Sequence, residues 1–463
     1  MFANKKVNFI SINLTVIAFI AFGCKGSGIP IEKAARDNFK EVSKNYRPND
    51  SKPELPKLTP ESSIQDFLLF AMLNNPKVEA AYYDWAASIE RITAARSRPD
   101  PQLTFSADIA KMVSAVMVGL MIDLPGPGKL KAAGNVAGAE SESRHFAFES
   151  EVLATAYSLK NAYYRIKFLE DNIRIEKETM QLLTDLETLA TQQNAAGRAG
   201  IQDVLRIQIE KEQLKTQIEN LTESKLTLLA EFKAALGLGH KENDPPTPIV
   251  FNSSEEAPDK EQILESAFQN NPGIQLMTAD VRRAQAMINL EKKSRVPDFS
   301  VGVEADVKAN PIMITPSFGI TLPIWREKIA ANIAAAQFEK KSAEARLNSE
   351  SIKLATELAM MLYSYSESMR NAKVLVEKLI PKGKEALTAS RMGYATGKSS
   401  FLDVIESYRQ LLGFDLALIE AQTQRELSLI SLSLLIAATP PKGSPILNQK
   451  EKSNSPHTKE GSK

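Results

Sequence analysis

Gly397, Lys398 and Ser399 form the tripeptide that ends the phosphate-binding loop of many nucleotide-binding proteins. That loop has four residues between its first glycine and the Gly-Lys-Ser, whereas only three residues separate Gly393 from Gly397. The loop also follows a β-strand. Here apolar residues recur at helical spacing on both sides of the glycine, so the sequence predicts a turn between two helices. This helical context and the short spacing argue against a nucleotide-dependent enzyme.

No other residues have the spacing of a catalytic or metal site. The histidines are His145, His240 and His457, far apart in a chain with one cysteine. This pattern matches no familiar zinc site or catalytic triad, so we expect neither an enzyme nor a bound metal or other cofactor. Lysine and arginine number 57 against 56 aspartates and glutamates, a balance that offers no basic surface to nucleic acid.

The N-terminus has the composition of an export signal. Two lysines precede a largely apolar segment, residues 7–21, which ends shortly before Cys24. The four residues AFGC that end at Cys24 resemble a bacterial lipobox, although leucine is usual where Ala21 stands. We predict a signal peptide over residues 1–23 and a covalent lipid that includes palmitate on Cys24. An ordinary cleaved signal and an uncleaved anchor are the alternatives.

Landmarks of the first half of the chain recur in the second half in the same order. At separations of 196 to 200 residues, the matched positions are Asn74 with Asn270, Ser97 with Ser294, Leu124 with Leu322, and Gly197 with Gly397. A period this long indicates two large copies of one unit rather than a solenoid of small repeats.

The repeat divides the chain into segments. We place the first copy at residues 61–238 and the second copy at 260–438, with a linker rich in proline and charge at 239–259. Residues 24–60 form an N-terminal tether, and the polar tail 439–463 is predicted to be disordered.

Each copy predicts the same order of elements. A helix, 62–97 or 260–294, is followed by two strands with strict apolar-polar alternation, within 102–124 or 298–322. No internal segment has the ~20 apolar residues of a membrane helix, and the strands approach the ~9–11 residues of a membrane strand. These strands would therefore make any membrane crossing. A soluble hairpin with one wet face is the alternative.

A long helical hairpin follows the strands in each copy. Residues 129–195 would span about 100 Å as one helix, and the return helix has apolar residues at coiled-coil spacing from Leu214 to Ala235. The hairpins reverse at Gly197 and Gly397, where glycine tolerates the positive φ of a helix end. Pro381 should kink or break the descending helix of the second copy, because its nitrogen carries no hydrogen.

The lipobox-like start, the duplication and the "G-x5-D-V" turn in both copies resemble the TolC-type outer-membrane efflux proteins over residues 61–437. The resemblance implies a mainly α fold with a membrane β-barrel. Three chains would form a homotrimer, each giving four strands to one shared barrel and its helices to a periplasmic tunnel. It implies a passive exit duct in the bacterial outer membrane, working with a periplasmic adaptor and an inner-membrane pump of the RND or ABC type.

The family's site residues carry over by position. The adaptor would dock on the hairpin tips, at Gly197, Arg198, Ala199, Gly200, Gly397, Lys398 and Ser399. Tyr394 would bond to the neighbouring hairpin, and Asp403 with Glu406 would line the periplasmic gate. Alternatively, the glycines are simple helix caps and the acids lie on a solvated helix start, where they are stabilised. Ser399 stands where some relatives carry an arginine latch.

Two questions stay open at this stage. A lipid-anchored periplasmic coiled-coil scaffold without a pore would explain the helices and Cys24, but not the alternating strands. The cargo, a drug, metal ion, small organic molecule or protein, is not encoded in a readable motif. Methionines near the strands are either soft-metal ligands or apolar filling: Met112, Met117, Met121 and Met313.

Overall fold

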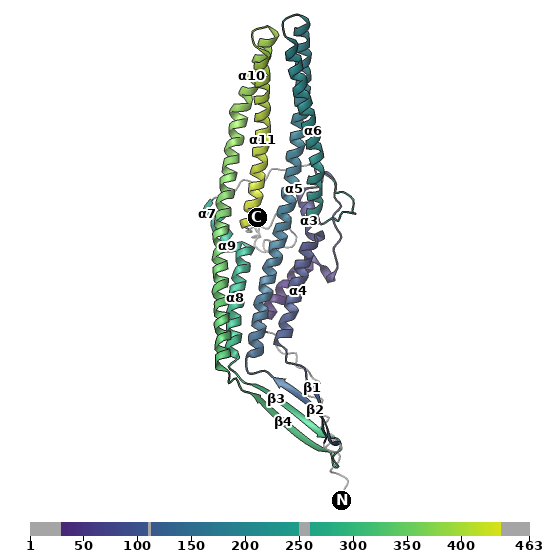
Figure 1. Ribbon diagram of the computed structural model, residues 1–463, viewed down its shortest axis with the longest axis vertical. Helices are drawn as coiled ribbons and strands as arrows, with labels where there is room; N and C mark the ends of the chain where they lie inside the picture. The colour runs from purple at the N-terminus through teal and green to yellow at the C-terminus, as the bar shows by residue number, and fades with distance from the viewer. Residues whose placement is uncertain (1–28, 110–112, 250–259, 437–463) are drawn as a thin grey trace, which may run out of the picture.

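The two halves of the chain repeat one order of elements along a single long axis (Figure 1). This computed structural model describes residues 29–109, 113–249 and 260–436. The first half contains α3 (Ile64–Asn74), α4 (Pro76–Arg96), β1 (Gln102–Ile109), β2 (Val113–Leu124), α5 (Lys129–Ala195) and α6 (Ile201–Ala235). The second half contains α7 (Lys260–Asn270), α8 (Pro272–Lys293), β3 (Asp298–Asp306), β4 (Met313–Thr321), α9 (Arg326–Val374), a π-helical segment (Leu375–Leu379), α10 (Ile380–Ala395) and α11 (Phe401–Ile436).

Each helix that we predicted as continuous, 62–97 and 260–294, is in fact two helices, and the prediction was wrong at that point. The break falls before Pro76 in the first copy and before Pro272 in the second. A residue before proline is pushed out of the helical region, and Asn75 has φ −69° and ψ 121°. Its side chain then accepts a hydrogen bond from the Lys77 N–H, so asparagine ends one helix and caps the next.

The long helical hairpins form as predicted. Helix α5 has 67 residues, about 100 Å at ~1.5 Å per residue. The seam of α6 faces it, with Leu214, Phe232 and Ala235 buried. Lys225 occupies the skipped position of the seam and pairs across it with Glu170 of α5 at 2.9 Å. In the second copy, the π-helical segment interrupts the descending helix and ends at Leu379, two residues before Pro381, whose nitrogen has no hydrogen to donate.

The four strands form one antiparallel sheet at the end of the molecule opposite the hairpin turns (Figure 1). Their order is β1-β2-β3-β4, so within the described chain β1 and β4 are edge strands. Strand β2 pairs with β3 across the two copies, for example Leu120 with Val303. Each copy thus contributes a hairpin, and one continuous sheet joins the copies.

The larger hydrophobic core is that of the first copy, joined by Tyr46 from the segment before it. It gathers Tyr46, Phe67, Trp85, Phe148 and Phe232, all with at most 1% of their surface exposed. The corresponding cluster of the second copy is smaller and aliphatic, built from Ile263, Ala267, Ile274, Leu354, Leu358 and Leu432. Much of the apolar surface of α9 is exposed instead, including Phe338 and Ile352.

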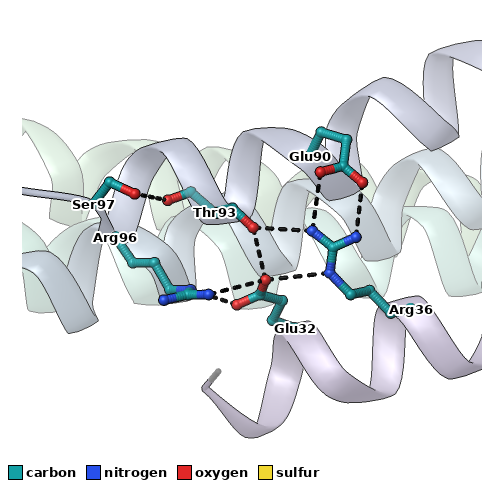
Figure 2. A network of polar contacts seen from close by, with 6 residues as sticks. All are labelled: Glu32, Arg36, Glu90, Thr93, Arg96 and Ser97. Atoms are coloured by element: carbon teal, nitrogen blue, oxygen red, sulfur yellow. Dashed lines mark hydrogen bonds and ion pairs between the residues drawn. The ribbon is translucent and has the colours of Figure 1, made fainter. Parts of the chain in front are cut away.

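Helix α2 (Pro30–Tyr46), which the tether prediction missed, is held against α4 by a network of charges (Figure 2). Glu32 is 3% exposed and accepts hydrogen bonds from Arg96, from Thr93 at 2.7 Å and from Arg36 at 3.2 Å. Arg36 also donates to both carboxylate oxygens of Glu90. The Arg96 hydrogen bond, opposed by burial and helped by the other donors, lowers the pKa of Glu32 to about 2.

Candidate functional site at the hairpin tips

Both hairpins reverse through the same glycine turn. Gly197 has φ +67° and Gly397 has φ +75°, a region that glycine adopts without the penalty of a Cβ atom. Behind Gly197, the Arg198 N–H donates to the Gln193 carbonyl oxygen at 2.9 Å. Lys398 makes the same bond to Gly393 at 2.7 Å. This pattern satisfies the last carbonyls of each helix, and it is a Schellman cap.

The Gly-Lys-Ser tripeptide lies between α10 and α11, as predicted, so a helix and not a strand leads into it. Its backbone is used by the turn itself, because the N–H groups of Lys398 and Ser399 both point to the Gly393 carbonyl oxygen. A phosphate-binding loop needs such N–H groups for its ligand. The tripeptide is therefore part of a helix cap.

The two tips pack against each other through one hydrophobic cluster. Its members come from all four helices of the hairpins: Leu183, Leu186, Ala190, Val204, Ile207, Leu214, Leu387, Tyr394, Phe401, Val404, Ile405 and Tyr408. The Tyr394 and Phe401 rings meet edge to face, with centroids 5.5 Å apart. Burial of this cluster fixes where one tip lies relative to the other.

Polar contacts add to this packing between the tips. The Tyr394 hydroxyl donates to Asp203 Oδ2 across 3.5 Å, a long bond. Burial, and then the Asp203 carboxylate, raise the pKa of Tyr394 to about 12, so its hydroxyl keeps its proton at neutral pH. Arg409 of α11 pairs with Glu210 of α6. That hydrogen bond is the main reason why the pKa of Arg409 is raised.

The predicted gate acids lie on the exposed side of the first turns of α11. Asp403 closes a capping box: its Oδ2 accepts from the Ser400 N–H at 2.9 Å and from the Ser400 hydroxyl at 2.8 Å, and that hydroxyl accepts from the Asp403 N–H at 3.2 Å. These bonds lower the pKa of Asp403. Glu406 lies one turn further along, and its charge contributes to the raised pKa of Arg409. A capping role for Asp403 and the predicted gate role are compatible.

A hollow of about 280 Å³ lies between the tips, among the predicted docking residues. Its lining includes Arg198, Ala199, Gly200, Gly397 and Ser399, together with Asp203 and Tyr394. Gly197 and Lys398 lie outside that lining and are exposed at the ends of the turns. The predicted docking residues thus occupy one surface that both hairpins share.

Sequence reasoning missed three members of this site: Asp203, Glu210 and Arg409. Asp203 could have been found, because it is the repeat counterpart of Asp403 and the position before α6 is Gly200 instead of serine. Without a serine cap, its carboxylate is available to a neighbour. The pairing of Glu210 with Arg409 carries no such signal, because it depends on how the two hairpins are rotated against each other.

Two further properties bear on function. In the part of the chain that the structure describes, no three residues among histidine, cysteine, aspartate and glutamate are placed to hold a metal ion. Of the helices described, none has the length and hydropathy needed to cross a membrane.

The profile of the family described as "Outer membrane efflux protein" matches residues 70–238 and 263–438, one match for each copy of the repeat. The chain belongs to this family. It is an outer-membrane exit duct for efflux that extends into the periplasm.

Individual relatives agree with this assignment. The chain is 22% identical over 354 residues to the cobalt-zinc-cadmium resistance protein CzcC of Cupriavidus metallidurans, covering 75% of this chain and 84% of CzcC. The outer membrane protein VceC of Vibrio cholerae has a similar fold, with a TM-score of 0.68 at 16% identity over 81% of this chain and 95% of VceC. The Campylobacter jejuni CmeC channel gives 0.70 at 14% identity over 83% and 89%.

Proposed function

We propose that three copies of the chain assemble into one duct, in which their sheets close into a shared outer-membrane barrel and their helices form a periplasmic tunnel. The observation that carries this proposal is the sheet. One of its faces is apolar yet exposed, as at Phe105, Val301 and Phe318. Among the described residues, the outer edges of β1 and β4 have no strand beside them, and lipid does not tolerate unpaired backbone groups. Closure with two further sheets covers both edges.

The duct is passive and catalyses no reaction. An inner-membrane pump of the RND or ABC type supplies the energy, and a periplasmic adaptor docks on the tips, at the surface around Arg198 and Lys398. A lipid on Cys24, which lies outside the described residues, adds a second attachment to the membrane, since one acyl chain alone binds marginally. The name of the relative CzcC favours efflux of small solutes over secretion of a protein.

Asp403 and Glu406 form two carboxylate rings around the closed end of the tunnel. Both are exposed on α11, three residues apart and thus on one helix face. Rings of carboxylates favour cations in a pore. Tyr394, bonded to Asp203, holds the two hairpins of one chain together at this end.

A lipid-anchored coiled-coil scaffold without a pore is the rival function. The scaffold function explains the buried seam of α6, but it does not explain why one face of the sheet is both apolar and exposed. A face of this kind costs solubility in water unless lipid or protein covers it.

Single-channel recording in planar bilayers tests the proposal. The purified protein should give small, cation-selective openings. Asp403→Asn with Glu406→Gln should raise the conductance and lower the cation selectivity, because the rings lose their charge. The amide oxygen of the new Asn can still accept from the Ser400 N–H, so part of the capping box is retained.

The matched control is Glu219→Ala with Glu223→Ala, which removes the same charge from the exposed side of α6. This variant should conduct as the wild type does. Folded trimers without any conductance would contradict the duct and favour the scaffold. Equal effects of both double variants would contradict the gate assignment alone.

A further inference from the structure

The register of the sheet separates its residues into two chemically different faces. Cross-strand partners and alternate residues of a strand share a face. One face is apolar: Leu103, Phe105, Ala107, Val116, Val118, Leu120, Ile122, Leu124, Phe299, Val301, Val303, Ala305, Ile314, Pro316, Phe318 and Ile320. The other face is polar, with serine, threonine, glycine and carboxylates, and glycine contacts such as Gly119 against Thr104 and Glu304 confirm that these partners meet there.

Three methionines lie on the polar face: Met117, Met121 and Met313. By register, the continuous apolar surface of the sheet lies on the opposite face. Met313 is 63% exposed and packs in no core. Met112 lies outside the described residues. A thioether on a polar face can act as a ligand for a soft metal ion, and the neighbours of these methionines indicate where such an ion would bind.

Met117 and Met313 flank one carboxylate. The register places Met117 opposite Asp306 in the β2-β3 pair and Asp306 opposite Met313 in the β3-β4 pair, so the three side chains form one row across three strands. Neighbours in such a row have Cβ atoms about 4.5–5.5 Å apart, and the flexible methionine side chains can reach over the aspartate between them.

Asp306 is held in place within this row. Its Oδ1 accepts from the Lys308 N–H at 2.9 Å and from the Val116 N–H at 3.3 Å. Both bonds to described residues use Oδ1, so Oδ2 is the oxygen that would meet a cation. Glu304 lies on the same face two residues away along β3, and it adds negative charge beside the row.

We propose that Met117, Asp306 and Met313 form a binding site for a soft monovalent cation of the silver(I) or copper(I) type. Thioether ligands select soft ions, whereas hard divalent ions prefer oxygen alone. The carboxylate supplies the negative charge that balances the ion. Two sulfurs and one oxygen on an exposed sheet hold the ion weakly, which is what a pathway requires of a site that must also release its ion.

This site would lie on the export path of the duct, so the inference rests on the proposed function. In the closed barrel the apolar face meets lipid, so the polar face and the row line the lumen. The row lies near the β1-β2 and β3-β4 turns, at the end of the sheet away from the helices (Figure 1). A cation leaving the tunnel would meet it last.

The test measures silver(I) binding to the detergent-purified full chain by equilibrium dialysis in chloride-free nitrate buffer. Met117→Leu with Met313→Leu keeps the side-chain volume and removes both sulfurs. We expect this variant to lose one bound silver equivalent per chain, and Asp306→Asn to bind the ion more weakly. Labelled methyl signals of Met117 and Met313 should shift with added silver in NMR spectra of the wild type.

The matched control is Met360→Leu with Met392→Leu, which removes two exposed thioethers from the helices. It should retain the site and its NMR shifts. Unchanged binding in the Met117 and Met313 double variant, or equal loss in both double variants, would overturn the site. Conductance is recorded separately on the same preparations, so a wild-type protein that conducts normally but binds no silver at this row overturns this inference and leaves the duct in place.

Discussion

The two hairpin tips carry an aspartate at the same place in the repeat, yet the two carboxylates bond to different partners. Asp403 bonds to Ser400 and caps its own helix. Its counterpart Asp203 is preceded by Gly200, which has no hydroxyl, and Asp203 accepts from Tyr394 of the other hairpin. One residue before the helix thus decides whether the acid serves its own tip or the neighbouring one.

Two more pairs of matched positions in the repeat differ, and in each pair the residue of the second copy makes the contact between the tips or is buried. Tyr394 reaches across to the first tip, whereas its counterpart Asn194 donates to the Ala199 carbonyl oxygen within its own turn. Phe401 is 3% exposed, whereas its counterpart Ile201 is 58% exposed. The duplication preserved the glycine turn in both copies, and divergence around it buried Phe401 in the second tip and left Ile201 exposed in the first.

The largest expected effect comes from the pair Phe401 and Ile201. Phe401→Ala should lower the free energy of unfolding by about 3–5 kcal/mol, because it empties a filled position between the hairpins. Ile201→Ala should change it by less than about 0.5 kcal/mol, because that side chain is largely in solvent. Denaturant unfolding followed by circular dichroism measures both. Similar losses would mean that Ile201 is covered in the assembled protein.

The cap on the second tip should have an intermediate effect. Ser400→Ala removes the N-cap hydroxyl and should cost about 1 kcal/mol. The Asp403 bonds depress its pKa below the ordinary 3.8, so their contribution is present above that pH and is lost as the pH falls through the lowered value. The difference between variant and wild type should shrink below about pH 4. A difference that is independent of pH would contradict the capping box.

The smallest expected effect is a gain in stability. Gly200→Ser gives the first tip the cap it lacks and should stabilise α6 by a few tenths of a kcal/mol. The added Cβ would meet only the end of the Gln202 side chain, which can move. With Asp203 drawn to its own helix, the pKa of Tyr394 should fall from about 12 toward its ordinary 10.

Ultraviolet titration of the tyrosines measures this change, with Tyr394→Phe as the background that identifies its signal. Burial is the larger cause of the raised pKa, so the fall should be partial. An unchanged titration would show that Asp203 prefers Tyr394 over a local cap.

Much of the fold could be predicted from the sequence, because its signals are local and repeated. Alternation gave the strands, helical spacing gave the long hairpins, and Pro381 marked the π-helical interruption. Pro76 and Pro272 could have predicted the two helix breaks, but the apolar residues at helical spacing on both sides favoured one continuous helix. Helix α2 could not be predicted as a docked element, because its attachment depends on Glu32 meeting Arg96 from a distant helix.

The candidate site was predictable only in part. The turn glycines follow from the need for positive φ, and the acids near each helix start follow from the helix dipole. Which hairpin face meets which is a matter of tertiary packing, so the contacts of Tyr394 with Asp203 and of Arg409 with Glu210 could not be derived. The functional roles assigned to these residues stay predictions until the gate variants are recorded.

The hydrogen bonds around Glu32 also limit how far the segment before α2 can reach from the helices. They fix the first turn of α2 beside the end of α4 that leads into the sheet (Figure 2). Cys24 precedes Pro30 by six residues, and an extended chain covers at most about 3.6 Å per residue. A lipid carried by Cys24, as we propose, would therefore lie within about 22 Å of that point. Such a lipid would limit where the membrane surface can lie along the molecular axis, and lengthening this short segment would release that limit without altering any packed element.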